Sequence, residues 1–151
     1  MNRKALSIVF LSSLLAAALF PSCSPDSSSS PAAPEARISA HLRGTNQLAV
    51  TITVPPRYHA YLDAGDGNAL IPVSFDWSAS GLQPKPLSSP EGERDETVQA
   101  RVLRGRSEFV FAADNAATAS GRSVRVQTQI CNEERGICYR PRWQDALIQA
   151  N

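Results

Sequence analysis

The sequence predicts an all-β domain, and three observations favour a β-sandwich. Apolar residues alternate with polar or small ones over short stretches, and turn-rich segments separate these stretches at sandwich-like intervals. The folded part lacks the apolar periodicity of a useful amphipathic helix. Residues 37–151 have the length of one domain, so we expect a single hydrophobic core.

Two stretches carry the strand pattern most clearly. In residues 48–54, apolar side chains at every second position alternate with alanine and threonine. In residues 123–130, Val124 and Val126 alternate with polar residues before Ile130. We expect each strand to bury one face and expose the other. Further candidate strands are residues 37–42, 70–77, 96–103 and 107–112.

The prolines predict a loop, and the two tryptophans have expected positions in the fold. Several prolines keep residues 81–92 irregular, which predicts a long surface loop there. Trp77 continues the period-two pattern of the strand before it and is expected in the core. Trp143 follows Pro141, and two placements stay open for it: covering the sandwich end near the cysteines, or packing within the last strand.

The first 22 residues have the features of a secretory signal peptide. Arg3 and Lys4 precede an apolar run at residues 5–20 that is short for a membrane span. Cys23 follows a small residue, as in bacterial lipoprotein signals. We therefore expect residues 1–22 to be removed and Cys23 to be lipidated. Ordinary cleavage that leaves Cys23 as a free thiol is the alternative.

The segment that follows predicts a tether. Residues 23–36 are rich in serine, proline and alanine without apolar periodicity, so they are expected to link the lipid to the domain at residues 37–151. Several acyl chains would hold such a protein durably on a membrane. The expected location is the periplasm or the outer cell envelope.

Charge and motifs exclude several classes of function. The 15 basic and 14 acidic residues nearly cancel, with or without Arg3 and Lys4, so the sequence gives no indication of nucleic-acid binding. A glycine-rich phosphate loop and a hydrolase nucleophile elbow are both absent. We expect no cofactor.

Cys131 and Cys138 enclose six mostly polar residues, and the strand at 123–130 leads into them. Facing residues of an antiparallel hairpin lie close enough for a disulfide. In the chain-entropy model, a disulfide that closes so short a loop stabilises the folded state by only ~2.5 kcal/mol, so its structural benefit is small. Spacing alone leaves two interpretations open: a redox-active pair, or a permanent hairpin disulfide in a non-catalytic binding or scaffold lipoprotein.

Metal binding is a third interpretation. Two thiolates together with His41 or His59 would be suitable ligands for zinc or copper(I). Neither histidine lies near the cysteines in sequence, and the only methionine is Met1, so the soft-ligand clusters of copper carriers are absent. We therefore expect no metal.

Short motifs in the domain resemble the N-terminal periplasmic domain of the DsbD family, which passes reducing equivalents from cytoplasmic thioredoxin to periplasmic proteins. The most specific motif matches the residues around the second active cysteine of that family: Gly136, Cys138, Tyr139 and Pro141. A weaker motif follows an alternating strand and comprises Tyr58, His59 and Tyr61.

The resemblance implies an immunoglobulin-like antiparallel β-sandwich whose cysteine pair works by thiol-disulfide exchange. It assigns the mixed disulfide with a partner to Cys138 and the resolving step to Cys131. The implied partners are thioredoxin-like periplasmic proteins. This sequence contains neither the membrane-embedded carrier nor the C-terminal thioredoxin-like domain of full-length members. The implied electron donor is therefore a separate membrane conductor, and the domain would be one component of a protein-disulfide reductase.

One departure from the family concerns the covering of the cysteines. In the family a loop with an aromatic tip shields the pair, whereas residues 81–105 contain no aromatic side chain here. Either Leu82 or Leu87 takes that place, or the pair is more exposed.

Overall fold

The computed structural model describes residues 33–65 and 70–150. They lie within one compact unit, Ala32–Asn151. The predicted signal peptide, Cys23 and most of the predicted tether fall outside the described residues.

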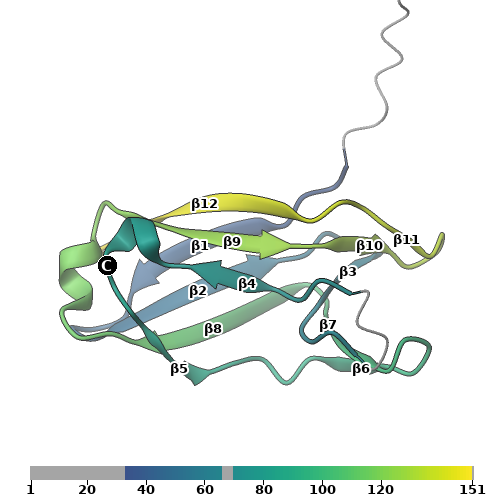
Figure 1. The fold of residues 1–151 in the computed structure, drawn as a ribbon, viewed down its shortest axis with the longest axis horizontal. Coiled ribbons are helices and arrows are strands. Elements are labelled where there is room, and N and C mark those ends of the chain that lie inside the picture. Colours follow the sequence, from purple (N-terminus) through teal and green to yellow (C-terminus); the bar gives the residue numbers. More distant parts are fainter. Residues whose placement is uncertain (1–32, 66–69, 151) are drawn as a thin grey trace, which may run out of the picture. The chain divides into compact units, whose positions relative to one another are not determined.

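The larger sheet of this unit contains seven strands. They are β1 (Arg37–Leu42), β2 (Gln47–Thr53), β4 (Ser74–Asp76), β5 (Lys85–Ser88), β8 (Arg106–Ala112), β9 (Ser123–Thr128) and β12 (Arg142–Gln149). Their order is β4-β9-β12-β1-β2-β8-β5 (Figure 1). Neighbouring strands are antiparallel except β1 and β12, which run parallel.

The smaller sheet contains five antiparallel strands. They are β3 (Tyr58–Tyr61), β6 (Glu93–Asp95), β7 (Ala100–Leu103), β10 (Ile130–Asn132) and β11 (Ile137–Cys138), in the order β11-β10-β3-β7-β6. Two short 3-10 helices, η1 (Ser78–Ser80) and η2 (Ala116–Ala119), lie at the end opposite the β10–β11 hairpin (Figure 1). No helix among the described residues is long and apolar enough to cross a membrane.

The main core fills the space between facing parts of the larger sheet. Phe75 of β4 meets Phe109 and Phe111 of β8 edge to face, with ring centroids 5.0 and 4.9 Å apart. β4 and β8 stand near opposite ends of the strand order, so their aromatic contact shows that the sheet curls and that its two halves face each other. Ala60 and Leu103 add the smaller sheet to the same core. The predicted all-β, immunoglobulin-like sandwich is confirmed.

β2 follows the predicted alternation, but the expectation of one exposed face is wrong for it. Leu48, Val50 and Ile52 point into the main core and are fully buried. On the opposite face Ala49 and Thr51 are only 0% and 4% exposed. β2 lies between β1 and β8, so neighbouring strands cover these small side chains from both sides.

The prediction of an irregular loop over residues 81–92 is also wrong, because β5 forms inside it. Lys85 and Pro86 pair with Ala112 and Phe111 of β8, and the register then shifts before Ser88. β5 is an edge strand of the larger sheet. A proline is accommodated there because its missing N–H can face away from the ladder.

Three strands are shorter than the alternation suggested. β4 covers only Ser74–Asp76, and β7 begins at Ala100 after a turn in which Gln99 has a φ of +53°. β9 ends at Thr128, and Gln129 separates it from β10. At this break the chain passes from the larger sheet to the smaller one, which places the first cysteine on the smaller sheet.

The two tryptophans have different surroundings. Trp77 is partly buried against the main core, as predicted, with its ring centroid 4.9 Å from that of Phe111. Trp143 lies within the last strand, β12, the second of its two expected placements: it is 41% exposed, and the guanidinium of Arg125 lies 5.2 Å from its ring centroid. Its face is the outer one, because Ala146, three positions later on the same strand, is buried.

Candidate redox site

The two cysteines face each other across the β10–β11 hairpin. Cys131 and Cys138 are register partners with Cα atoms 4.0 Å apart, and a disulfide joins them. One residue pair further along, the N–H of Tyr139 donates to the carbonyl of Ile130 at 2.9 Å. Because hydrogen-bonded and non-hydrogen-bonded pairs alternate, the cysteines occupy a non-hydrogen-bonded pair, in which side chains lie closer. The hairpin itself therefore brings the two sulfurs together.

A glycine closes the turn between the cysteines. Gly136 has a φ of +60°, a conformation that favours glycine, and its N–H donates to the carbonyl of Asn132 at 3.0 Å. The side-chain oxygen of Asn132 accepts the N–H of Arg135 at 2.8 Å. The turn thus uses both the backbone and the side chain of Asn132 to hold the two short strands in register.

The two sulfur-bearing residues differ sharply in accessibility. Cys131 is only 1% exposed, whereas Cys138 is exposed, and its neighbour Ile137 is 52% exposed. An approaching reactant can therefore reach the disulfide from the Cys138 side. An attack on Sγ of Cys138 breaks the disulfide and releases the Cys131 thiolate. In the reverse reaction the buried Cys131 thiolate attacks Sγ of Cys138 and forms the disulfide again.

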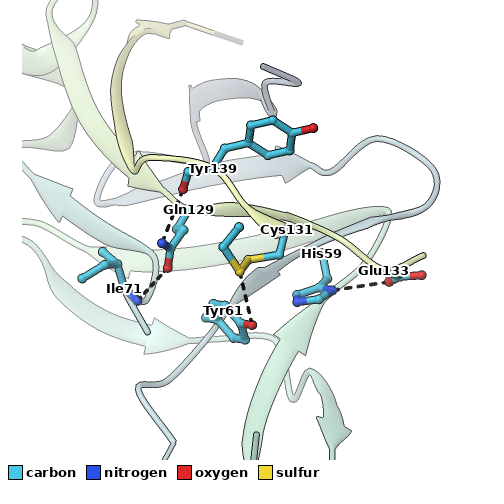
Figure 2. The surroundings of a disulfide bond; sticks show 8 residues. His59, Tyr61, Ile71, Gln129, Cys131, Glu133 and Tyr139 are labelled. Carbon is cyan, nitrogen blue, oxygen red and sulfur yellow. Dashed lines mark hydrogen bonds and ion pairs between the residues drawn. A yellow bond between two sulfur atoms is a disulfide. The ribbon is translucent and has the colours of Figure 1, made fainter. Parts of the chain in front are cut away.

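Strand β3 supplies the side chains beside the disulfide. His59 pairs in register with Cys131, and side chains alternate along the strand. His59 and Tyr61 therefore share the face of the disulfide (Figure 2). Tyr58 instead packs against the main core. The rings of His59 and Tyr61 meet edge to face with centroids 5.1 Å apart.

A hydrogen bond connects β3 to the exposed cysteine. The hydroxyl oxygen of Tyr61 lies 3.7 Å from Sγ of Cys138. Burial raises the pKa of Tyr61, and the nearby Asp95 raises it further. The phenol therefore stays protonated at neutral pH and donates its proton toward the sulfur.

His59 is held neutral beside the same pair. Burial lowers the pKa of His59, which outweighs the opposite effect of Glu133, and Arg104 lowers it as well. The shortest approach of His59 to the Glu133 carboxylate is 3.7 Å, from Nδ1 to Oε1. The imidazole accordingly adds no positive charge next to the disulfide at neutral pH.

An arginine that the sequence pattern did not single out fastens the hairpin to the neighbouring strands. Arg104, directly after β7, places Nε 2.5 Å from Oε1 of Glu133 and Nη1 2.6 Å from Oε2 of Glu93. Glu133 belongs to the hairpin turn and Glu93 begins β6. One guanidinium thus links three separate segments of the smaller sheet.

Gln129 is a second residue that sequence reasoning missed. Its Oε1 accepts the N–H of Ile71 at 3.0 Å, and its Nε2 donates to the carbonyl of Tyr139 at 3.4 Å (Figure 2). The side chain at the break between β9 and β10 therefore ties the returning arm of the hairpin to the segment before β4. An isolated polar residue at the end of an alternating strand gives no sequence signal for this role.

An open hollow of about 350 Å³ adjoins the disulfide. Thr97 and Val98, from the turn between β6 and β7, form part of its wall. Of the two alternatives for the covering, the one in which Leu82 or Leu87 covers the cysteines is wrong, and the exposed Cys138 agrees with the other, a more exposed pair. Leu82 packs against the main core, and Leu87 is 56% exposed on β5 in the other sheet.

The predicted site residues divide into two groups. Five of them line the hollow: His59, Tyr61, Cys131, Gly136 and Cys138. Tyr58 and Tyr139 instead face each other with ring centroids 6.4 Å apart, and Pro141 is an exposed residue just before β12. Cys23 lies outside the described residues.

The metal interpretation gains no support from this arrangement. Within residues 33–65 and 70–150, no group of three or more histidine, cysteine or acidic side chains is arranged to hold a metal ion. His41 lies on β1 of the larger sheet. The nearby His59 would be a single nitrogen ligand beside two sulfurs.

A sequence model of one protein family matches residues 28–150, and its description is "Thiol:disulfide interchange protein DsbD, N-terminal". The chain belongs to the DsbD N-terminal family. Thiol-disulfide exchange is therefore the chemistry of this domain, and domains of this family are periplasmic.

Two solved structures from Neisseria meningitidis are similar to this chain. One is the DsbD N-terminal domain in the reduced form, with 20% sequence identity, a TM-score of 0.49, and coverage of 77% of this chain and 86% of that chain. The other is the complex between the DsbD N-terminal and PilB N-terminal domains, with 18% identity, a TM-score of 0.43, and coverage of 74% and 80%. No curated protein matches the chain.

Proposed function

We propose that this domain relays reducing equivalents in the periplasm, from a membrane electron conductor to thioredoxin-like client proteins. The observation that carries the proposal is the unequal exposure of the bonded cysteines, with Cys131 only 1% exposed and Cys138 open to solvent. A relay needs one sulfur that a partner can reach and a second that only the first can reach. The β10–β11 hairpin meets both requirements.

The exchange proceeds in two steps from the reduced domain. The Cys138 thiolate attacks one sulfur of a client disulfide, and the other client sulfur leaves with the electron pair of the broken bond and takes up a proton. The Cys131 thiolate then attacks Sγ of Cys138, closes the hairpin disulfide and releases the second client thiol. Two electrons and two protons pass to the client. Reduction by the conductor restores the two domain thiols by the reverse sequence.

The supporting roles follow from the contacts around the hairpin. Tyr61 donates a hydrogen bond to Sγ of Cys138 and would stabilise the thiolate that attacks. Gly136 closes the turn, and the facing rings of Tyr58 and Tyr139 help to hold the arm that follows Cys138. Pro141 precedes β12, where the chain returns to the larger sheet. His59 fills the space behind Cys131 without adding charge at neutral pH.

The amino-terminal part of the proposal concerns location. Residues 1–22 would be removed as a lipoprotein signal, Cys23 would carry the lipid, and residues 23–36 would tether the domain at 37–151 to the membrane. Labelling of the expressed protein with a radioactive fatty acid tests this. The label should enter the wild-type protein and be absent from Cys23→Ser, and an unlabelled wild type would exclude the anchor.

Trapping of partners tests the relay. In Cys131→Ala the resolving thiol is missing, so Cys138 should accumulate in mixed disulfides with thioredoxin-like periplasmic proteins. The matched Cys138→Ala variant should trap none of them, because its remaining thiol is buried. Recovery of the same partners by both variants, or of no thioredoxin-like protein by Cys131→Ala, would overturn the proposed relay.

A further inference from the structure

The hollow beside the disulfide is large enough for a small molecule. Its volume of about 350 Å³ lies at the low end of the range of small-molecule sites, roughly 300 to 1,000 Å³. Cys138, the exposed half of the disulfide, contributes to its wall. A reactant held in the hollow would therefore lie next to the sulfur that is open to attack.

The turn between β6 and β7 leaves this space open because its side chains are short. Thr97 and Val98 border the hollow, and Thr97 is itself exposed. The N–H of Thr97 donates to Oδ1 of Asp95 at 2.9 Å, which fixes the turn at that edge. A small disulfide would meet Cys138 without first displacing a bulky side chain.

The charges around the hollow favour a cation over an anion. Asp95 and Glu133 both contribute to its wall, and Arg104 is the one cationic side chain among its described lining residues. Arg104 is already bonded to the carboxylates of Glu133 and Glu93. Burial lowers the pKa of His59, so its imidazole is neutral near pH 7. The lining thus carries a net negative charge that attracts ammonium groups and repels carboxylates.

We propose that the reduced domain also reduces small disulfides that carry ammonium groups, binding them in the hollow beside Cys138. The inference rests on the proposed exchange chemistry and extends it from protein clients to disulfides of simple aminothiols. The Cys138 thiolate attacks one sulfur of the small disulfide, and the first small thiolate leaves and is protonated. The Cys131 thiolate then displaces the second. The domain ends as its disulfide, and two small thiols are released with both electrons and both protons.

The test compares three small disulfides of similar size and different charge. They are cystamine, with two ammonium groups, 2-hydroxyethyl disulfide, which is neutral, and dithiodiglycolate, with two carboxylates. Each is mixed in excess with the reduced domain, and the loss of protein thiols is followed by alkylation and mass spectrometry. Each rate is divided by the rate of the same disulfide with 2-mercaptoethanol, which removes differences in intrinsic reactivity. At low ionic strength the normalised rate should be about ten-fold higher for cystamine than for dithiodiglycolate, and salt should reduce this ratio.

Two variants connect the selectivity to the hollow. Asp95→Asn keeps the oxygen that accepts the Thr97 N–H and removes a charge, so it should lower the cystamine to dithiodiglycolate ratio. The matched Asp145→Asn variant removes a carboxylate on β12, where Asp145 approaches Arg125 at 3.9 Å, and should leave the ratio unchanged. Thr97→Phe should narrow the hollow and slow all three disulfides.

The outcomes separate this inference from the proposed function. Equal normalised rates for the three disulfides, or an unchanged ratio in Asp95→Asn, would overturn the inference. A reduced domain that exchanges with a thioredoxin-like protein but not with cystamine would also overturn it, and the relay would stand. If Cys138→Ser reacted with cystamine as fast as wild type, both proposals would fall.

Discussion

The hydroxyl of Tyr61 lies 3.7 Å from Sγ of Cys138, although the two residues are 77 positions apart in the chain. The contact forms because β3 and β11 both flank β10 in the smaller sheet. It places a hydrogen-bond donor beside the exposed sulfur, which carries the negative charge when Cys138 is a thiolate in the reduced domain.

Tyr61→Phe removes that donor and little else. Loss of one hydrogen bond to the Cys138 thiolate should lower the fraction of thiolate at neutral pH and slow alkylation of Cys138 in the reduced domain by about three-fold. The measurement is the rate of iodoacetamide labelling, resolved by residue. Tyr58→Phe is the matched control, because Tyr58 packs against the main core, and it should label at the wild-type rate. Equal slowing in both variants would count against a specific role for Tyr61.

His59 should make the stability of the domain depend on pH. Burial lowers its pKa below the ordinary value of 6.5, so the unfolded chain binds more protons than the folded one in the window between the two pKa values. Stability contributed by neutral His59 is therefore complete above pH 6.5 and is lost as pH falls through that window. Glu133, Arg104 and Asp95 are the charged groups that act on the imidazole.

Urea unfolding near neutral pH and about one unit below 6.5 measures this effect. The free energy of unfolding should fall with pH in the wild type and fall less in His59→Phe. His41→Phe, which removes the histidine on β1, should retain the wild-type dependence. An identical pH dependence in wild type and His59→Phe would show that other groups cause it.

Arg104 links β6, the end of β7 and the hairpin turn through two carboxylates. All three side chains are partly exposed, so Arg104→Met should cost only about 1 kcal/mol of unfolding free energy, with less effect at high salt. Arg43 pairs with a single carboxylate, that of Glu108, and Arg43→Met should cost less than about 0.5 kcal/mol. Chemical denaturation at two salt concentrations measures both. A salt-independent loss in Arg104→Met would contradict an ion-pair origin.

Gly136 and Gly105 allow a matched test of turn geometry. Their φ values are +60° and +58°, and an added Cβ would meet nothing within 4 Å at either position. Alanine should therefore cost about 1 to 2 kcal/mol at each, from backbone strain alone. Equilibrium unfolding of the two alanine variants gives the comparison. A much larger loss at Gly136 would indicate that the hairpin turn does more than adopt the left-handed conformation.

Much of the fold could be predicted from the sequence because strand alternation is a local property. Val124 and Val126 identified β9, and residues 37–42 coincide with β1. The two-sided burial of Ala49 and Thr51 could not be predicted, since it depends on which strands flank β2. The edge strand β5 was missed for a related reason: prolines disfavour interior strands but are accommodated at an edge.

The site could be predicted only in part. The spacing of Cys131 and Cys138 identified the hairpin pair. The family motif pointed to Tyr58, His59 and Tyr61, but a strand at these residues was not predicted. Arg104, Gln129 and Thr97 gave no signal, because their contacts depend on long-range arrangement. Arg104 is 29 positions from Glu133, and Gln129 is 58 positions from Ile71. Alternation along a strand does not encode such pairings.

The most direct test of the central claim is the reduction potential of the Cys131–Cys138 disulfide. The domain is equilibrated in redox buffers of known potential, and the fraction of free thiol is read by alkylation and mass spectrometry. An exchange module should titrate above about −300 mV, in the range of other thiol-disulfide exchange proteins. A midpoint below about −300 mV would contradict this account. It would instead indicate a permanent hairpin disulfide in a non-catalytic binding or scaffold lipoprotein.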